Sequence, residues 1–463
     1  MSDSIAFRGR SETLRPVLSL ATWAALVLVA GSAVASPGSN LGFGTRSPAL
    51  AGATVADSEG PVSVFENPAE LVRAPGTWLS LGYGTSSFDF RVDGRDAGLE
   101  SVGTIDFGAV VPGAVLELPV AFGLAFSLPN GRFSRLRTAL PTDPHWPLDD
   151  ARSELFDLGM ALAARPLESL SLGVGVGFLA AVRGRFRVLG TAVAADGSGA
   201  EYDSSLVHAV DADLVSVRYP IAGARFEPSE RLTFGLSYRG EARVEQRVEG
   251  LLLGDVRVGL TDIPVRYAFR TRATAAFSPR TGALGASVRV LDRLTLHGEL
   301  EHQAWSSYPT PYAEASAQLT ASPPPGVTLE PPPDRPAPPA PKLADRFVPR
   351  VGAEARLPVN GSIAVALRAG YAFERSPVPE RQPQTLLFDF DRHRLGLGAE
   401  AVLKEPFDVL HSLRLEASFS LSEGAERSVV TGPDAAPVEH YADGRVVAAS
   451  VALGFVFAGS GGH

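Results

Sequence analysis

The chain has 463 residues and a formal net charge of −9, and 20% of its residues are charged. This acidic balance argues against nucleic-acid binding, which usually requires a basic face. Cysteine is absent, which excludes disulfides, thiolate metal sites, cysteine nucleophiles and lipid attachment to an N-terminal cysteine. The 47 glycines and 37 prolines favour a turn-rich β protein over a helical bundle.

Residues 1–35 are predicted to be a signal peptide for export. Arg8, Arg10 and Arg15 precede an apolar stretch from Val17 to Ala30, and Ala33-Val34-Ala35 is a small-x-small cleavage site. The alternative is a single anchoring helix, but the apolar stretch is short for a membrane span. No later stretch approaches 18 uninterrupted apolar residues, so we expect an exported chain that is periplasmic, secreted or a β-barrel.

Residues 36–76 follow as a segment rich in glycine, alanine and serine that shows no strand pattern. Its small residues include Gly42, Gly44, Ala49, Ala51, Gly52, Ala53 and Ala56. A segment of this length and composition could fold back into a narrow lumen. We therefore predict an N-terminal plug, or hatch.

From Trp78 onward the sequence alternates between apolar and polar or small residues with a period of two, which is typical of β-strands. The clearest example has one apolar face, formed by Ile363, Val365, Leu367, Ala369, Tyr371 and Phe373. In a soluble β-sandwich this face would pack against a second sheet. In a membrane barrel it contacts lipid, while the polar face lines the lumen.

The pattern predicts an all-β membrane barrel of about 14 antiparallel strands, residues 77–457, with the plug inside its lumen. The expected strands are 77–90, 103–118, 120–133, 153–165, 170–188, 206–226, 232–248, 268–290, 294–308, 347–357, 362–373, 392–403, 412–421 and 446–457. Tight turns are expected at Pro119 and at 166–169, 228–231, 291–293 and 358–361. Longer loops are expected at 91–102, 134–152, 189–205, 249–267, 309–346, 374–391 and 422–445. Short turns at one rim and long loops at the other are typical of outer-membrane barrels.

A proline-dense loop at about residues 321–345 contains three proline runs. Such a composition favours extended polyproline conformations. It is interpreted as a stiff, solvated outer loop, with a peptide ligand for a partner domain as the alternative. Residues 458–463 form a C-terminal tail beyond the last strand.

Three motifs carry a resemblance to a known family. The predicted plug contains Ala56-Asp57-Ser58 and ends with Asn67-Pro68-Ala69 just before the first strand. The strand ending in Tyr371-Ala372-Phe373 runs into Ser376-Pro377-Val378-Pro379, and Asp391-Arg392 enters the next strand. Ala304-Trp305-Ser306 lies in the ninth strand. The sequence thereby resembles the FadL-type long-chain fatty acid and hydrocarbon transporters of the outer membrane.

The resemblance implies passive uptake without an energy source. A hydrophobic ligand would land among the outer loops and enter a lumen site, and the plug would shift to release it. The residues implied in the plug and its gating are Asn67, Pro68, Ala69 and Asp57. In the family a kink in the third strand opens the wall sideways, and Gly123 or the turn beginning at Pro129 is a candidate for such a break.

Two departures from the family pattern bear on the substrate and on assembly. The chain continues beyond Phe457 instead of ending on an aromatic residue. The loop between the fifth and sixth strands is short for one that holds a ligand-capturing helical hairpin.

Many charged residues fall at positions predicted to face the lumen. A guanidinium there could receive a fatty-acid carboxylate through a bidentate hydrogen bond. The alternative is that these arginines pair with neighbouring glutamates and brace the lumen. The candidate ligand contacts are Arg239, Arg243, Arg289, Arg368 and Arg394. Further inward charges are expected at Glu241, Glu245, Arg247, Arg270, Arg272, Glu299, Glu400, Arg414 and Glu416.

No enzymatic activity, cofactor or metal is predicted. Strand alternation places His297 on one face with Glu299 and Glu301, and His302 on the other, which is a poor metal site. The Gly-x-Ser-x-Gly elbow of serine hydrolases is absent from the sequence. The expected partners are a hydrophobic small molecule and outer-membrane lipid, with no nucleic acid, and the chain is expected to be a monomer.

Three functions remain open at this point. The first is a transporter of fatty acids or hydrocarbons, which the Ser-Pro-Val-Pro loop favours. The second is a plugged barrel of the same superfamily with a structural or secretion-partner role. The third is a general porin for polar solutes.

Overall fold

The computed structural model describes residues 43–130, 143–149, 156–190, 192–193, 206–258, 261–322, 334 and 336–457. The predicted signal peptide, residues 36–42, most of the proline-rich run and the C-terminal tail lie outside the described residues. Within the described part, no helix is long and apolar enough to cross a membrane.

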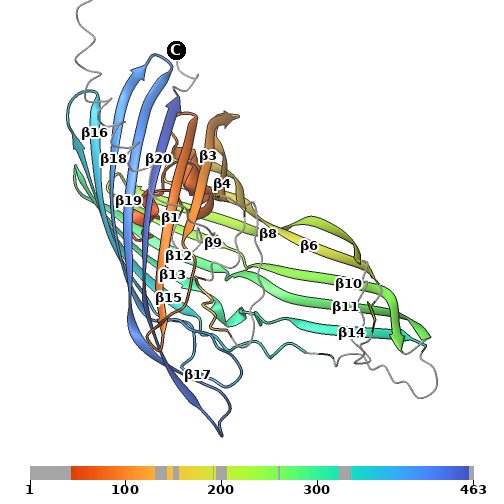
Figure 1. Ribbon diagram of the computed structural model, residues 1–463. Helices are drawn as coiled ribbons and strands as arrows, with labels where there is room; N and C mark the ends of the chain where they lie inside the picture. The colour runs from red at the N-terminus through yellow and green to blue at the C-terminus, as the bar shows by residue number, and fades with distance from the viewer. Residues whose placement is uncertain are drawn as a thin grey trace, which may run out of the picture.

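The strands form a closed antiparallel barrel of 14 strands, as the sequence predicts (Figure 1). The first strand pairs with the last, Trp78 opposite Val456, and this pairing closes the wall. The wall strands are β1 Trp78–Val92, β3 Val102–Val115, β4 Leu118–Pro129, β5 Asp157–Leu167, β6 Leu170–Gly190, β8 Leu206–Ser229, β9 Leu232–Arg239, β12 Thr281–Leu291, β13 Leu294–Gln303, β15 Arg346–Pro358, β16 Ile363–Glu374, β18 Arg392–Phe407, β19 Leu410–Thr431 and β20 Val438–Phe457.

Alternation along each strand separates a lipid face from a lumen face. In β12, Leu284 is 59% exposed and points outward, whereas Ala283, Gly285 and Ser287 are turned inward. Leu284 lies opposite Leu236 of β9 and Leu300 of β13, which are also exposed. Such rows of exposed leucines form the apolar belt that a barrel presents to acyl chains.

Tight turns lie at one end of the barrel, the end to which the C-terminus of β20 returns (Figure 1). The turn expected at Pro119 is instead formed by Leu116 and Glu117, and Pro119 belongs to β4. Both turn residues have positive φ, 49° and 66°, as a two-residue hairpin turn requires. The expectation of a turn at Pro119 was wrong because a strand's first residues tolerate proline.

The segment 249–267 is not a loop, contrary to the sequence prediction. β10 Ala242–Val258 and β11 Thr261–Ser278 form one long hairpin, and β14 Glu314–Ala321 pairs with β11 inside the predicted loop 309–346. The apolar run Leu251-Leu252-Leu253 and Pro264 break the period-two pattern. The alternation therefore did not predict strands in this segment. β19 and β20 likewise extend into the predicted loop 422–445.

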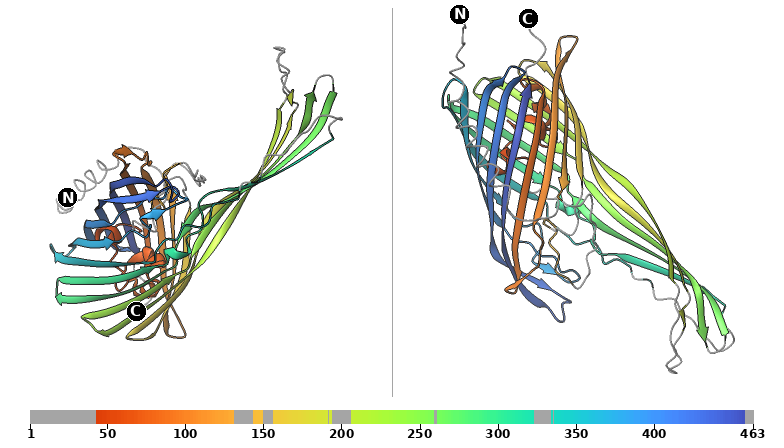
Figure 2. Two further views of the ribbon diagram at one scale, coloured as in Figure 1. Left: turned by 90° about the horizontal axis from the view of Figure 1, so that it is seen from below. Right: turned by 45° about the horizontal axis from the view of Figure 1, so that its top comes forward.

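These strands build a projection that we call the arm: β10, β11, β14 and the ends of β6 and β8 nearest residues 190 and 206. Gly184 of β6 pairs with Val248 of β10 in parallel, whereas the 14 wall strands pair with one another in antiparallel fashion. The arm leaves the long-loop end of the barrel obliquely and reaches far beyond the barrel's outline (Figure 2). The structure also has three strands of two residues each. β2 Arg95–Asp96 pairs with β1, β7 Ala192–Val193 pairs with β10, and β17 Arg381–Gln382 pairs with β19.

Residues 43–77, which we call the inner segment, lie inside the barrel near the tight-turn end. The inner segment is made of short helical turns, namely α3 Arg46–Ala49, η1 Gly60–Val62, α4 Ser63–Glu66 and η2 Pro68–Arg73. One further turn, η3 Trp305–Ser307, lies at the long-loop end after β13. The inner segment is therefore surrounded by the lumen-facing side of the wall.

A charge in the apolar belt should destabilise the barrel according to its depth. We expect Leu284→Arg to lower the free energy of unfolding by about 2–4 kcal/mol, because Leu284 lies within a row of leucines. The matched control is Leu291→Arg, at the tight turn, where the cost should be about 0–1 kcal/mol. Denaturant unfolding in lipid vesicles measures both, and equal costs would contradict a lipid-facing belt at Leu284.

Candidate functional site

The inner segment touches the wall through glycines that face the lumen. A Cβ added at Gly223 of β8 would lie 2.0 Å from Asn67 Oδ1, and one at Gly173 of β6 would lie 2.4 Å from the carbonyl carbon of Pro68. Eight other wall positions have the same property toward the inner segment, namely Gly108, Gly123, Gly159, Gly235, Gly285, Gly370, Gly396 and Gly398. Because these residues have no side chain, the inner segment's backbone can lie directly on the wall.

Asn67-Pro68-Ala69 makes the tightest of these contacts. The Asn67 side chain is fully buried, and its Nδ2 donates to the carbonyl oxygens of Val55 at 2.7 Å and Ala224 at 3.1 Å. Its Oδ1 accepts the backbone N–H of Ala69 at 3.1 Å and so caps η2, with Pro68 at the first helical position. Asn67 therefore links two parts of the inner segment to the wall.

Asp57 holds the inner segment together from within. It forms ion pairs with Arg73 at 2.8 Å and with Arg46 at 3.2 Å, and Arg46 also donates to the Asp57 carbonyl oxygen. Arg46 continues to the wall, where its Nε lies 3.0 Å from Glu354 of β15. Asp57 thus orients the arginine that reaches the wall.

Further hydrogen bonds and an ion pair fix the inner segment to the wall, and sequence reasoning missed these contacts. Glu299 of β13 accepts the backbone N–H groups of Thr54 and Val55, both at 2.9 Å. Arg225 of β8, fully buried, pairs with Glu70 at 3.0 Å. The inward alternation of the predicted strands marks Glu299 and Arg225 as lumen residues, but alternation alone does not reveal their partners.

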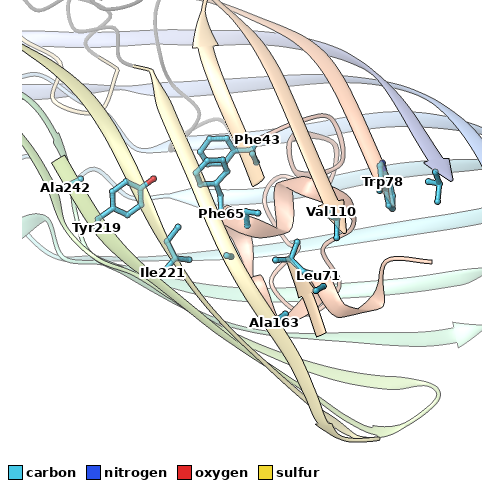
Figure 3. Close-up of a cluster of buried hydrophobic side chains, with 14 residues drawn as sticks. Phe43, Phe65, Leu71, Trp78, Val110, Ala163, Tyr219, Ile221 and Ala242 are labelled. Atoms are coloured by element: carbon cyan, nitrogen blue, oxygen red, sulfur yellow. The ribbon is translucent and has the colours of Figure 1, made fainter. Parts of the chain in front are cut away.

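A pocket of about 660 Å³, part of it open to solvent, lies between the inner segment and the wall strands β1, β3 and β4. The rings of Phe43 and Phe65 stack on each other with centroids 4.1 Å apart, and Trp78 begins β1 beside them. Figure 3 shows these rings grouped with Leu71 and Val110 in one apolar cluster. The cluster makes one side of the pocket apolar and aromatic.

The other side of this pocket is charged, but its arginines are already paired. Arg368 contacts Glu354 at 2.6 Å and also Glu400. Arg414 contacts Glu59 at 2.9 Å and Glu400 at 3.0 Å, and its guanidinium stacks over Trp78 at 4.2 Å. The third arginine in the lining is Arg46, described above. Asp106 and Glu416 add carboxylates to the same lining.

A second pocket of about 460 Å³ continues toward the long-loop end and shares Phe43, Gly44 and Asp106 with the first. Its lining carries the hydroxyls of Ser86, Thr104, Ser127, Ser418 and Ser450. Together the two pockets follow the wall at β20, β1, β3 and β4 beside the inner segment. They form a route along one side of the lumen.

Aromatic residues form a cluster toward the long-loop end, next to Ala448 of the second pocket. Trp146 packs between Phe90, Phe388 and Phe390, with ring centroids 4.6–5.9 Å apart. The Arg392 guanidinium lies over Phe390 at 5.0 Å. Beside this cluster, Trp305 and Tyr308 lie in a second apolar cluster with Val378 and Leu387.

Two of the three family motifs found in the sequence meet at the long-loop end. Val378 of the Ser376–Pro379 loop is buried in the cluster of Trp305. The Asp391 side chain accepts the Ser376 backbone N–H at 2.8 Å, and Arg392 pairs with Asp149 and Asp389. Two of the three motifs thus build the outer closure, and the third, Asn67-Pro68-Ala69, secures the inner segment.

The five arginines proposed as ligand contacts separate into two groups. Arg368 and Arg394 are buried in the lumen and ion-paired, Arg394 with Glu374 at 2.6 Å, and Arg239 also faces the lumen. Arg243 and Arg289 are instead exposed and lie outside the enclosed lumen, which corrects the prediction. Arg243 is exposed where β10 leaves the wall, because the chain changes face between Arg239 and Ala242. Arg289 is exposed at the tight-turn rim.

The charges expected along β10 and β11 are also outside the lumen. Arg247, Arg270 and Arg272 are exposed on the arm, Arg272 and Arg247 pair with Glu245, and Glu241 is exposed as well. Glu299, Glu400, Arg414 and Glu416 do line the lumen. The arm, absent from the sequence prediction, accounts for every misplaced charge except Glu241 and Arg289.

Gly123 lies in the third wall strand, β4, and its pairing continues without a break. Gly123 is opposite Val110 of β3 and Ala161 of β5, with no register shift along either pair. Its missing side chain makes room for Val64 and Leu71 of the inner segment. Pro129 is the last residue of β4.

His297 is buried in the lumen with Ser287, whose Oγ lies 2.8 Å from Nδ1. Glu299 and Glu301 share its face, and His302 is on the other, as alternation indicates. In the described residues, no three metal-ligating side chains gather closely enough to hold an ion.

Residues 21–321 match the model of a family described as outer membrane protein transport protein (OMPP1/FadL/TodX). The chain belongs to this family. Its members are outer-membrane β-barrels, and this barrel therefore lies in the outer membrane. A search of curated protein sequences found no match.

Solved structures of the family share the fold at low sequence identity. A Pseudomonas aeruginosa FadL homologue is 15% identical with a TM-score of 0.53, covering 92% of this chain and 100% of its own. The monoaromatic hydrocarbon channel CymD is 14% identical with a TM-score of 0.53, covering 90% and 98%. The Ralstonia pickettii toluene transporter TbuX is 17% identical with a TM-score of 0.50, covering 90% and 99%.

Displacing Asn67 from the wall should open the lumen. We expect Gly223→Val to push Asn67 away, because its Cβ would overlap Oδ1, and to raise the steady ion current through the barrel. The control is Gly298→Val, where a Cβ meets nothing within 4 Å. Conductance in planar bilayers measures both variants. An unchanged current for Gly223→Val, with the barrel folded, would show that Asn67 does not keep the lumen closed.

Glu66 should make the docking of the inner segment sensitive to pH. Burial raises the pKa of Glu66 to about 7, and its Oε1 has no hydrogen-bond partner among the described residues. The folded state thus binds a proton more tightly than the unfolded chain, whose glutamates titrate near pH 4.3, so stability falls as the pH rises from about 4 to about 7.

We expect Glu66→Gln to remove part of this dependence and to raise stability at pH 8 by about 1–3 kcal/mol. Denaturant unfolding at pH 5 and pH 8 tests it, with the exposed Glu439→Gln as the control. A variant whose stability changes between the two pH values as much as that of the parent would rule out Glu66 as the group.

Proposed function

We propose that the chain is a channel for passive uptake of uncharged hydrophobic small molecules across the outer membrane, with monoaromatic hydrocarbons as the ligand class. The supporting observation is the pocket between the inner segment and β1, β3 and β4. It combines stacked phenylalanines and a tryptophan with a charged side whose arginines are neutralised. Apolar pockets with few polar contacts are typical of sites for small hydrophobic ligands.

The charges of this pocket disfavour a carboxylate ligand. Arg46, Arg368 and Arg414 each contact two carboxylates of the protein. A fatty-acid anion would have to displace one of them and leave a buried charge unpaired, which costs several kcal/mol, about 3–5. Asp106 and Glu416 would add repulsion. A neutral aromatic ring meets neither penalty.

The fatty-acid alternative has one candidate contact in the lumen. Arg239 faces inward, and its buried Nε has no hydrogen-bond partner in the described residues. Asp157 and Glu301 are near enough to interact with it electrostatically, so part of its charge is already balanced. Long-chain fatty acids would therefore require Arg239, whereas hydrocarbons would not.

The route begins at the aromatic mouth around Trp146 and Phe390, continues along the hydroxyl-lined pocket and ends at the apolar pocket. We propose that the inner segment is the plug, and that Asn67, Pro68, Ala69 and Asp57 hold it closed until a ligand shifts it. Such a channel consumes no energy and requires neither a catalytic residue nor a cofactor. A single chain suffices, since its wall is closed.

Uptake by cells tests the proposal. We expect cells with the protein in their outer membrane to take up labelled toluene several-fold faster than cells without it. Ala125→Phe, which fills the pocket from β4, should abolish this gain. The control is Leu124→Phe, its neighbour on the lipid face, which should retain it.

Labelled oleate separates the two ligand classes. Faster oleate uptake that is lost in Arg239→Gln would overturn the hydrocarbon proposal in favour of fatty acids. If neither compound is taken up faster and the protein co-purifies with another polypeptide, the structural or secretion-partner role replaces the channel. A large steady conductance for small ions in the parent protein would instead indicate a porin.

A further inference from the structure

The arm is a sheet with two chemically different faces. One face carries polar residues, namely Arg247, Glu249, Arg270, Arg272, Glu314 and Gln318, all exposed. The alternating positions place Val248, Tyr267, Phe269, Ala317 and Leu319 on the other face. The Phe269 ring lies across Gly250, and the Tyr267 and Phe269 rings have centroids 6.0 Å apart.

No second layer of described residues packs on the apolar face. β10, β11 and β14 have their main contacts with their neighbours in the same sheet. The ribbon views agree, because the arm extends as one layer beyond the barrel (Figure 2). A single layer with one apolar face needs a partner in order to remove that face from water.

The apolar face of the arm is continuous with the lipid face of the barrel. In β6, Leu172 and Val174 are exposed on the outside of the wall, and β6 pairs with β8 along its whole length without a register shift. An even number of residues separates position 172 from Gly184, so both lie on the same side of the strand. Gly184 pairs with Val248 of β10.

The strand pairing shows which residues of the arm lie on the same face as Gly184 and Val248. Gly250 lies opposite Phe269, and Phe269 lies opposite Ala317. Tyr267 likewise lies opposite Leu319. Residues opposite each other in neighbouring strands share a face of the sheet. The outside of the barrel wall and the apolar face of the arm are therefore one surface.

The arm bends away from the barrel axis at the long-loop end (Figures 1 and 2). The surface that faces lipid along the barrel wall therefore faces the membrane plane where it continues along the arm. The charged face is continuous with the lumen side and is turned toward water. We propose that the arm lies on the outer leaflet with its apolar face in the lipid interface, as a monotopic extension of the barrel's belt. Its occupant is outer-membrane lipid, and this assignment does not depend on the ligand transported.

The polar face has the composition expected for the side in water. Arg243, Arg247 and Arg272 all lie within 3.5 Å of Glu245, and Arg270 lies 3.2 Å from Glu249. Arginines outnumber carboxylates in this group, which suits the vicinity of anionic lipid head groups.

Single-cysteine labelling tests the proposal cleanly, because the chain has no cysteine of its own. Leu319→Cys places an environment-sensitive fluorophore on the apolar face, and Gln318→Cys places it on the polar face one residue away. Ala317→Cys and Ser316→Cys form a second matched pair. The mature chain is reconstituted in vesicles of phospholipid and lipopolysaccharide, and folding is checked by its resistance to denaturant.

We expect labels at 319 and 317 to emit at shorter wavelength. They should be quenched several-fold more by nitroxides on lipid acyl chains than labels at 318 and 316, with the reverse order for aqueous iodide. Equal iodide quenching at 318 and 319 would overturn the proposal. Protection of 319 from both quenchers would overturn it too, because protein would then cover the face. A second copy would be recognised by protection that depends on the protein-to-lipid ratio.

Discussion

The close approach of the inner segment to the wall is the constraint on which the lumen depends. A chain that enters a narrow barrel can place its backbone directly against the wall only where the wall has no side chains, and the lumen-facing glycines provide those places. Asn67 shows the benefit, since its amide reaches the Ala224 carbonyl oxygen directly over Gly223. The same glycines determine which side of the lumen is filled and which side remains open.

The charges of the lumen follow from this packing. The inner segment brings Arg46, Glu59 and Glu70 into a space with little water, and the wall supplies Glu354, Arg356 and Arg225 to neutralise them. Buried charges need such partners, because leaving one unpaired in a space with little water is strongly destabilising. Most lumen arginines are thereby committed to structure. The pocket that remains has aromatic walls and no spare cation in its lining, which is why it suits a neutral ligand.

The architecture could be predicted from sequence because the membrane imposes a simple rule on each strand. Alternation at Leu284 or Leu367 requires no knowledge of neighbouring strands, and the short turns follow from the alternation. Pairing partners and changes of face could not be predicted in this way. Arg239 faces the lumen, yet the chain switches side at Gly240 and Glu241, and a bulge at Val244 shifts the register again. A period-two count carried from Arg239 to Arg243 therefore gives the wrong face.

The arm was not predicted from the sequence, because its strands also lack the pattern that identifies a wall strand. A strand in the wall is recognised because one of its faces is lipid and the other is packed lumen, but Arg270 and Phe269 alternate without a core on either side. What holds these strands is pairing alone, including the parallel pair between Gly184 and Val248 across a long stretch of sequence. An isolated two-faced sheet in water would expose its rings and invite aggregation. The register of the arm is continuous with that of the barrel, which gives the arm a different environment. In the wall, alternation places one face in lipid and the other in the lumen, whereas in the arm it places one face in lipid and the other in water.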